Sequence, residues 1–115
     1  MNLSQLEENF KSACIKGDWA DIVQKAVVFS NGCQEVRKYD AAIVCLNKLA
    51  LDVKVYKKLL AVVLTALGTA YWEKAQLKKA LEQFEKALLL FKETDDKEGK
   101  AAILSIVGIT YWRKC

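Results

Sequence analysis

The chain has 115 residues, of which 53% are hydrophobic, so it is long and apolar enough for one domain with a substantial core. It contains no proline, which permits closely spaced helices, and no histidine, which removes the commonest general base and transition-metal ligand. The net charge of +4 comes from lysines that stand beside acids, and this mixture indicates solvated helix faces rather than a phosphate-binding patch.

The spacing of apolar residues predicts six helices joined by short connections. The first covers residues 3–15, where Ser4 and Glu7 have the spacing of a capping box. Gly17 is expected to end this helix, and Asp18 to cap the next one.

The second helix begins near Trp19, but Asn31-Gly32 has the composition of a turn and leaves its end open. The third covers about residues 39–51 and the fourth about 55–74. Residues 59–72 of the fourth helix are apolar on every face, so we expect neighbours to cover it on more than one side.

The fifth helix, residues 77–92, is clearly amphipathic. The polar stretch 93–97 is expected to be a loop. Asp95 and Glu98 then have capping-box spacing at the start of a sixth helix, which ends near Arg113.

The sequence LGTAYW at residues 67–72 recurs 40 positions later as VGITYW at 107–112. Glycine inside a helix costs about 1 kcal/mol relative to alanine, so Gly68 and Gly108 need a compensating role. We expect both to permit close approach of neighbouring helices, with the tyrosines filling the space between paired helices.

This repeat resembles the tetratricopeptide family, whose pattern is Trp-x2-Leu-Gly-x2-Tyr, then Ala-x3-Phe, then Ala. The matching residues are Leu64 (in place of the tryptophan), Leu67, Gly68, Tyr71, Ala80, Phe84 and Ala87. The 40-residue period exceeds the usual 34 and is similar to the lengthened repeats of adaptor proteins of that family. The resemblance implies an all-α fold, a helical-hairpin repeat solenoid of about six antiparallel helices.

The resemblance is clear over residues 59–112 and implies one domain over residues 1–115. Residues 1–54 form a degenerate repeat region, 55–94 the clear repeat, and 95–115 the start of a further, incomplete repeat. Residues 39–43 parallel 77–81, and Gly17-Asp18-Trp19 resembles a mid-repeat turn. These two segments cannot be placed in the same repeat register unless an irregular unit lies between residues 31 and 38.

In such repeats the first helix of each pair lines a groove that binds partner proteins. Carried onto this chain, the groove residues are Val62, Thr65, Thr69, Trp72, Glu73, Ser105, Ile109, Trp112 and Arg113. Some relatives hold a terminal carboxylate with lysine, asparagine and arginine, but the corresponding positions here hold Thr65, Ala66, Thr69, Ser105 and Ile106. The expected partner is therefore an amphipathic helix or an extended segment of a protein.

The apolar face of the sixth helix is too wide for the fifth helix to cover alone. Its members are Ile103, Leu104, Ile106, Val107 and Tyr111. We expect homo-oligomerisation or a partner to cover this C-terminal edge, or the chain to be part of a longer array.

Two other functions are weighed against the interaction module. A nucleic-acid-associated protein would bind through Lys54, Lys57, Lys58, Lys78 and Lys79. An enzyme is not expected, because Cys14 near Lys11 has no histidine to activate it.

The remaining expectations concern thiols, cofactors and location. No cysteines form a Cys-x-x-Cys pair, so neither metal nor cofactor is expected. Cys14, Cys33 and Cys45 lie among apolar residues, which indicates buried thiols in a reducing compartment. No secretion signal begins the chain, and no apolar run reaches the ~20 residues of a membrane span. We therefore expect a cytoplasmic protein.

Overall fold

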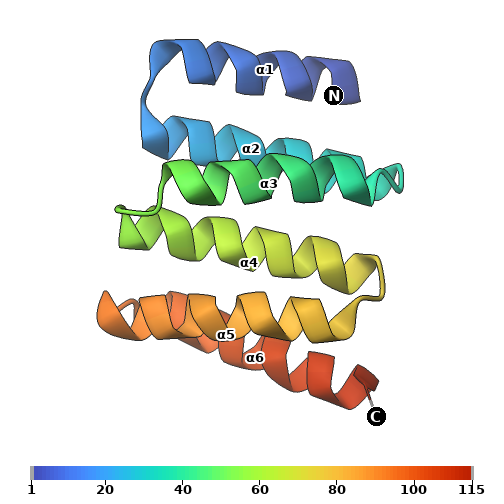
Figure 1. Ribbon diagram of the computed structural model, residues 1–115, viewed down its shortest axis with the longest axis vertical. Coiled ribbons are helices and arrows are strands. Elements are labelled where there is room, and N and C mark those ends of the chain that lie inside the picture. Colours follow the sequence, from blue (N-terminus) through green and yellow to red (C-terminus); the bar gives the residue numbers. More distant parts are fainter. Residues whose placement is uncertain (1, 115) are drawn as a thin grey trace.

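The computed structural model describes residues 2–114, which form six α-helices and no strand (Figure 1). Helices that follow one another in the chain lie side by side and run in opposite directions. The predicted all-α class and the predicted number of helices are confirmed for this part of the chain. The helices are α1 (Leu3–Lys16), α2 (Trp19–Glu35), α3 (Tyr39–Asp52), α4 (Lys57–Glu73), α5 (Leu77–Glu93) and α6 (Lys97–Lys114).

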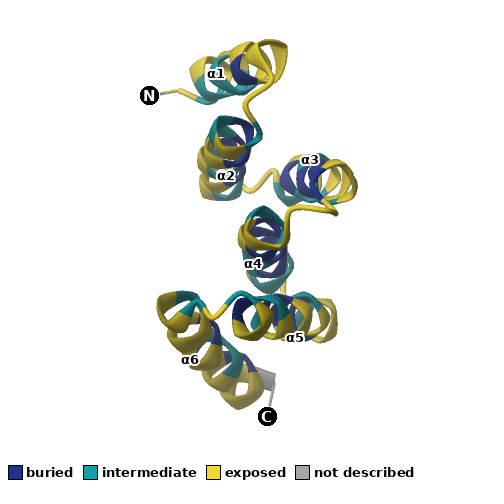
Figure 2. Cartoon of the chain, turned by 90° about the vertical axis from the view of Figure 1, so that its left-hand side faces the viewer, coloured by how far each residue is buried: buried dark blue, intermediate teal, exposed yellow. Residues whose placement is uncertain are grey.

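The helices stack as hairpins in two layers (Figure 2). The helices α2 and α4 lie in one layer and pack against each other directly, while α3 and α5 lie in the other. Each helix of the second layer fits between two of the first, because α3 contacts α2 and α4, and α5 contacts α4 and α6. At the N-terminal end, α1 packs on α2.

The centre of the stack is α4, which contacts α2, α3 and α5. This confirms the expectation that the apolar stretch 59–72 is covered on more than one side. Among the largest fully buried side chains are Phe84, Leu46, Leu67 and Ile103, which come from four different helices. The core is therefore continuous from α3 to α6 rather than confined to single hairpins.

The hairpin of α2 and α3 repeats that of α4 and α5 at an offset of 38 residues. Trp19 and Lys57 begin the first helices, and Tyr39 and Leu77 begin the second helices, at this same offset. Corresponding positions of the two hairpins, 38 residues apart, are also both buried. These pairs are Phe29 and Leu67, Ser30 and Gly68, Ala42 and Ala80, Leu46 and Phe84, and Leu49 and Ala87.

This offset resolves the register that the sequence left open. No irregular unit separates residues 31 and 38, and α2 continues through Asn31-Gly32 without a turn. Gly17-Asp18 connects α1 to α2, outside this correspondence, and its interpretation as a mid-repeat turn stays a prediction. The spacing then changes to 40 residues, both from Gly68 to Gly108 and from the start of α4 at Lys57 to the start of α6 at Lys97.

Three of the connections each contain one residue other than glycine in the left-handed backbone conformation. These residues are Arg37 (φ 61°), Ala75 (φ 66°) and Asp95 (φ 54°). In each, the following amide donates a hydrogen bond to the carbonyl five residues back, as from Lys38 to Cys33 at 2.7 Å. This satisfies a terminal helix carbonyl and reverses the chain within three residues. The tight connections explain why consecutive helices are antiparallel neighbours.

The predicted helix caps are partly confirmed. Gly17 (φ 81°) ends α1, and the Asp18 carboxylate accepts a hydrogen bond from the Ala20 amide at 3.2 Å. The capping box at Ser4 is wrong, because Asn2 caps α1 and Ser4 lies within the helix. The box at Asp95 is wrong by one residue, since Asp96 accepts from the Gly99 amide at 2.9 Å.

Candidate binding surfaces

The part of the predicted groove on α4 is a shallow surface of mixed polarity. Val62 is 40% exposed, and Glu73 is also exposed. The hydroxyls of Thr65 and Thr69 donate to carbonyls one helical turn earlier, at 2.8 and 3.0 Å. These hydroxyls are satisfied within the helix, so the threonines offer mainly their methyl groups to a ligand.

On α6, the predicted groove residues Ser105, Ile109 and Trp112 are all exposed. Trp112 is 83% exposed, and Ile109 is 57% exposed. The helices α4 and α6 also make fewer direct contacts than α2 and α4 do. The structure therefore places the predicted residues in two groups, one on each helix, rather than in one continuous lining.

Trp72 and Arg113 join the two groups at the C-terminal ends of α4 and α6. The Arg113 guanidinium carbon lies 4.2 Å from the centroid of the Trp72 ring. Its Nη1 also donates a hydrogen bond at 2.9 Å to the Trp72 carbonyl, which accepts a second one from the Ala75 amide at 3.0 Å. One side chain of α6 thus fixes both the backbone and the ring of Trp72.

The outer edge of α6 is partly covered. Ile103 is fully buried, whereas Leu104 and Tyr111 are about half exposed. The Tyr111 hydroxyl donates a hydrogen bond to Glu85 Oε1 of α5 at 3.2 Å. The expectation that α5 alone cannot cover α6 is confirmed for the described residues. The prediction that Gly108 permits close approach of a neighbouring helix is wrong, since nothing lies within 4 Å of where its Cβ would stand.

A hollow of about 790 Å³ opens between α1, α2 and α3, outside the predicted groove. The Phe10 ring of α1 stacks on the Phe29 ring of α2, with centroids 6.2 Å apart and planes 4° from parallel. The hollow is lined mainly by apolar side chains, which include Phe10, Cys14, Trp19, Ile22, Phe29, Ala41, Val44, Cys45 and Leu49. The hollow can bind an apolar surface, and its lining residues form no catalytic group.

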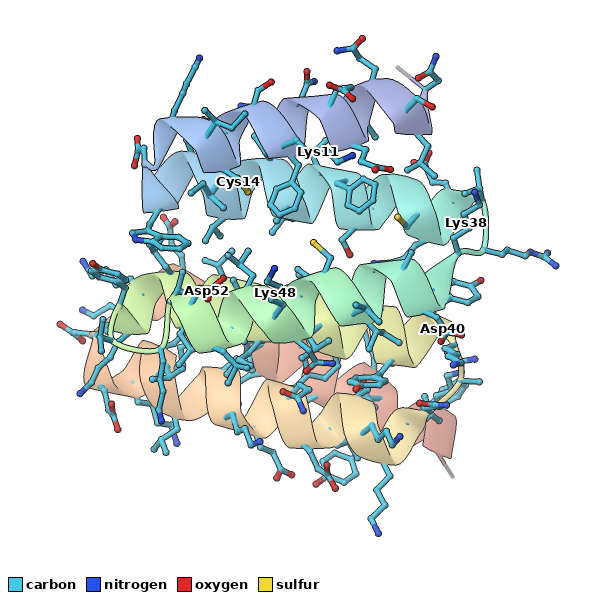
Figure 3. The ribbon with its side chains drawn as sticks, turned by 45° about the horizontal axis from the view of Figure 1, so that its top comes forward. Lys11, Cys14, Lys38, Asp40, Lys48 and Asp52 are labelled. Atoms are coloured by element: carbon cyan, nitrogen blue, oxygen red, sulfur yellow. The ribbon has the colours of Figure 1, made fainter. Side chains whose placement is uncertain are left out.

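Charged side chains surround this apolar lining (Figure 3). Lys11 forms an ion pair with Glu7 at 3.1 Å on α1. Asp40 of α3 is paired with Lys74 of α4. Lys48, which Figure 3 shows projecting from α3 toward α1, has no ion-pair partner among the described residues, and neither has Asp52 at the end of α3.

The cysteines differ in exposure. Cys33 is buried, as expected, and Cys45 is half-buried in the wall of the hollow. Burial raises the pKa of the Cys45 thiol to about 11, with smaller effects from Cys33 and Cys14. At neutral pH the Cys45 thiol is therefore protonated and serves as apolar surface. The expectation of a buried thiol is wrong for Cys14, which is exposed, and Cys115 lies outside the described residues.

The lysines weighed for nucleic-acid binding are partly engaged within the chain. Lys57 pairs with Glu93 at 3.2 Å, and the Lys79 ammonium lies 5.8 Å from the centroid of the Tyr71 ring. No helix within residues 2–114 combines the length and hydrophobicity of a membrane span.

The residues of the hollow could not be recognised from the sequence for an identifiable reason. Val44 and Ala41 occur among other apolar residues of a helix, so by themselves they do not differ from a core stripe. The informative comparison is with the next hairpin, where the residues 38 positions later are Glu82 and Lys79. That comparison requires the 38-residue register, which the parallel of residues 39–43 with 77–81 favoured but Gly17-Asp18-Trp19 left open.

Comparison with known proteins adds no relative. No model of a protein family matches the chain, and a search of curated proteins finds no significant match.

Proposed function

We propose that this chain is a cytoplasmic protein-interaction module of tetratricopeptide type, a scaffold or adaptor that binds a peptide or helix of a partner protein. The hairpin arrangement supports this proposal, because two units follow one register and stack with their first helices side by side. Such stacks present extended surfaces suited to binding other proteins.

The observation that carries the proposal is the exposed Trp112, whose neighbour in the sequence, Arg113, stacks on Trp72. An indole that is 83% exposed leaves a large apolar area in water. Tryptophan and arginine are the residues most enriched where binding energy concentrates at protein interfaces. This cluster is therefore the proposed centre of partner contact.

The contacts of Trp72, Arg113 and Trp112 support a mechanism of partner binding. Arg113 holds the Trp72 ring in place before any partner arrives, so less conformational entropy is lost on binding. Trp112 then supplies the surface that a partner buries, and Ile109 and Val62 extend the apolar contact along α6 and α4. Binding of this kind requires shape complementarity and no chemical step.

The test compares partner capture by the wild-type chain and by a Trp72→Ala, Trp112→Ala double variant. Circular dichroism checks that the double variant keeps its helical content. We expect capture of the wild type's specific partners to fall by at least about tenfold, because hot-spot residues dominate binding energy. The matched control is Leu89→Ala, which removes an exposed apolar side chain from α5 and should change nothing.

Two outcomes would contradict the proposal. Equal recovery of partners by the folded double variant would show that the tryptophan cluster is not the contact. Capture that is lost between low and moderate salt, together with recovery of nucleic acid, would favour binding through the lysines instead.

A further inference from the structure

The hollow between α1, α2 and α3 has apolar residues on its α3 wall where the next hairpin has charged or polar ones. Val44 is 68% exposed, whereas its counterpart is the exposed Glu82. The repeat therefore provides an internal comparison: the same position on the second helix of a hairpin accepts charge when it faces water. The three pairs, 38 residues apart, are Ala41 and Lys79, Val44 and Glu82, and Cys45 and Gln83.

This difference is not explained by the core of the chain. The residues of α3 that face α2 and α4, such as Leu46 and Leu49, are buried already. Val44 and Ala41 lie on another side of α3 and are exposed, so they contribute little to the stability of the isolated chain. Apolar side chains gathered around one hollow instead indicate a surface that another molecule covers.

The shape of the hollow selects the kind of molecule. Its α3 wall extends over residues 40–52, which at 1.5 Å per residue is about 18 Å. Its opposite wall is α1, which runs in the same direction as α3 (Figure 1), and the Phe29 ring lies on α2 between them. A trough between two parallel helices accommodates one face of a further helix, of roughly twelve residues by the same rise.

The charges around the hollow select the polar flank of that helix. Glu7 and Lys11 satisfy each other, and Asp40 is paired with Lys74, whereas Lys48 and Asp52, at the end of the wall, have no ion-pair partner among the described residues. Lys48 is exposed and stands in the middle of the α3 wall, beside Val44 and Cys45. An acidic side chain opposite the middle of the wall would complement Lys48, with an uncharged one opposite Asp52 at the end of the wall.

We infer that the hollow binds an amphipathic helix of a partner protein, which lays its apolar stripe on Phe10, Phe29 and Val44 and sets an acidic side chain against Lys48. This site is separate from the tryptophan cluster of α4 and α6. It extends the proposed function to a second contact with a defined ligand chemistry. Binding is mainly hydrophobic, and Lys48 orients the partner helix and selects for an acidic side chain on it.

The experiment uses three synthetic 14-residue peptides without aromatic residues, titrated into the intact chain by calorimetry. The first forms an amphipathic helix with a leucine stripe flanked by glutamates, and the second has lysines in place of the glutamates. The third has the composition of the first in scrambled order. We expect the glutamate peptide to bind most tightly and to shift the NMR signals of α1 and α3.

Variants locate the site. Val44→Glu introduces the residue that the next hairpin already has at this position, and we expect it to weaken glutamate-peptide binding by at least about tenfold. Ile15→Glu changes an α1 side chain that is 87% exposed and outside the hollow, so it should leave binding unchanged. Lys48→Glu should reverse the preference, so that the lysine peptide binds more tightly.

The inference is overturned if the scrambled peptide binds equally well, or if Val44→Glu and Ile15→Glu have the same effect. A Val44→Glu protein that fails to fold leaves Lys48→Glu, and an unchanged peptide preference in that variant overturns the inference. A wild-type dimer in sedimentation that Val44→Glu abolishes would identify a second copy as the occupant instead. The Trp72→Ala, Trp112→Ala protein should bind the glutamate peptide normally, which separates this inference from the proposed function.

Discussion

The Phe84 ring of α5 lies so close to Gly68 of α4 that a Cβ atom at residue 68 would stand 2.5 Å from Phe84 Cε1. Phe84 is fully buried, so its ring cannot move aside freely. Gly99 in α6 and Phe91 in α5 have the same relationship, at 2.4 Å. Close nesting of helices on glycine is therefore a repeated device at the contacts of α5.

Substitution of the two repeat glycines by alanine should give opposite results. Gly68→Ala places a methyl group against the Phe84 ring, and we expect a loss of about 1–3 kcal/mol of unfolding free energy. Gly108→Ala has open space around it, so the better helix propensity of alanine should add up to about 1 kcal/mol. Urea denaturation of both variants measures the difference, and equal effects would disprove the role of Gly68.

The left-handed residues in the connections offer a route to higher stability. Arg37 and Ala75 adopt positive φ angles that cost roughly 1 kcal/mol for residues other than glycine. We expect Arg37→Gly and Ala75→Gly each to raise the free energy of unfolding by about 0.5–1 kcal/mol. The control is Gly17→Ala, whose Cβ would meet nothing within 4 Å, so its expected destabilisation reports backbone strain alone. Thermal melting distinguishes these cases, and destabilisation by both glycine variants would contradict the prediction.

The Cys45 thiol should resist alkylation and make the protein less stable in alkali. Because burial raises its pKa to about 11, from an ordinary value of 9.0, only roughly one molecule in a thousand carries the thiolate at pH 8. Iodoacetamide should therefore modify the exposed Cys14 before Cys45, as peptide mapping by mass spectrometry would show.

The pH dependence of stability follows from the same shift. Between pH 9 and about 11 the folded chain keeps the Cys45 proton and the unfolded chain loses it. Raising the pH through this window therefore favours unfolding. The free energy of unfolding of Cys45→Ala should fall less steeply over this window than that of the wild type. Parallel curves for the two proteins would count against the raised pKa.

Several elements could be predicted from the sequence because they depend on neighbours in the chain. The amphipathic stripe of α5 and the stop at Gly17 are local properties, and both appear in the structure as expected. The cap of α1 could not be predicted in the same way. Asn2 and Ser4 are both good capping residues, and only the actual start of the helix decides between them.

The candidate surfaces show the same division. The sequence predicted Trp112 as a groove residue, but the structure was needed to show its exposure, since the preceding Tyr111, which was expected to pack, is itself half exposed. The contact between Trp72 and Arg113 could not be predicted either, because Arg113 stands 41 residues further along the chain and reaches Trp72 only through the packing of α6. The hollow depends on α1, α2 and α3 together, and no single helix contains its pattern.

By itself, then, the sequence determined the helices and the glycine–aromatic pattern of the repeats, since periodicity and turn chemistry act over a few residues. Only the tertiary structure decided the 38-residue register of the first two hairpins, the open space at Gly108 and the hollow beside Val44. The physical reason is that packing distance and burial depend on which faces of different helices meet. That choice is made by the whole stack rather than by any one segment.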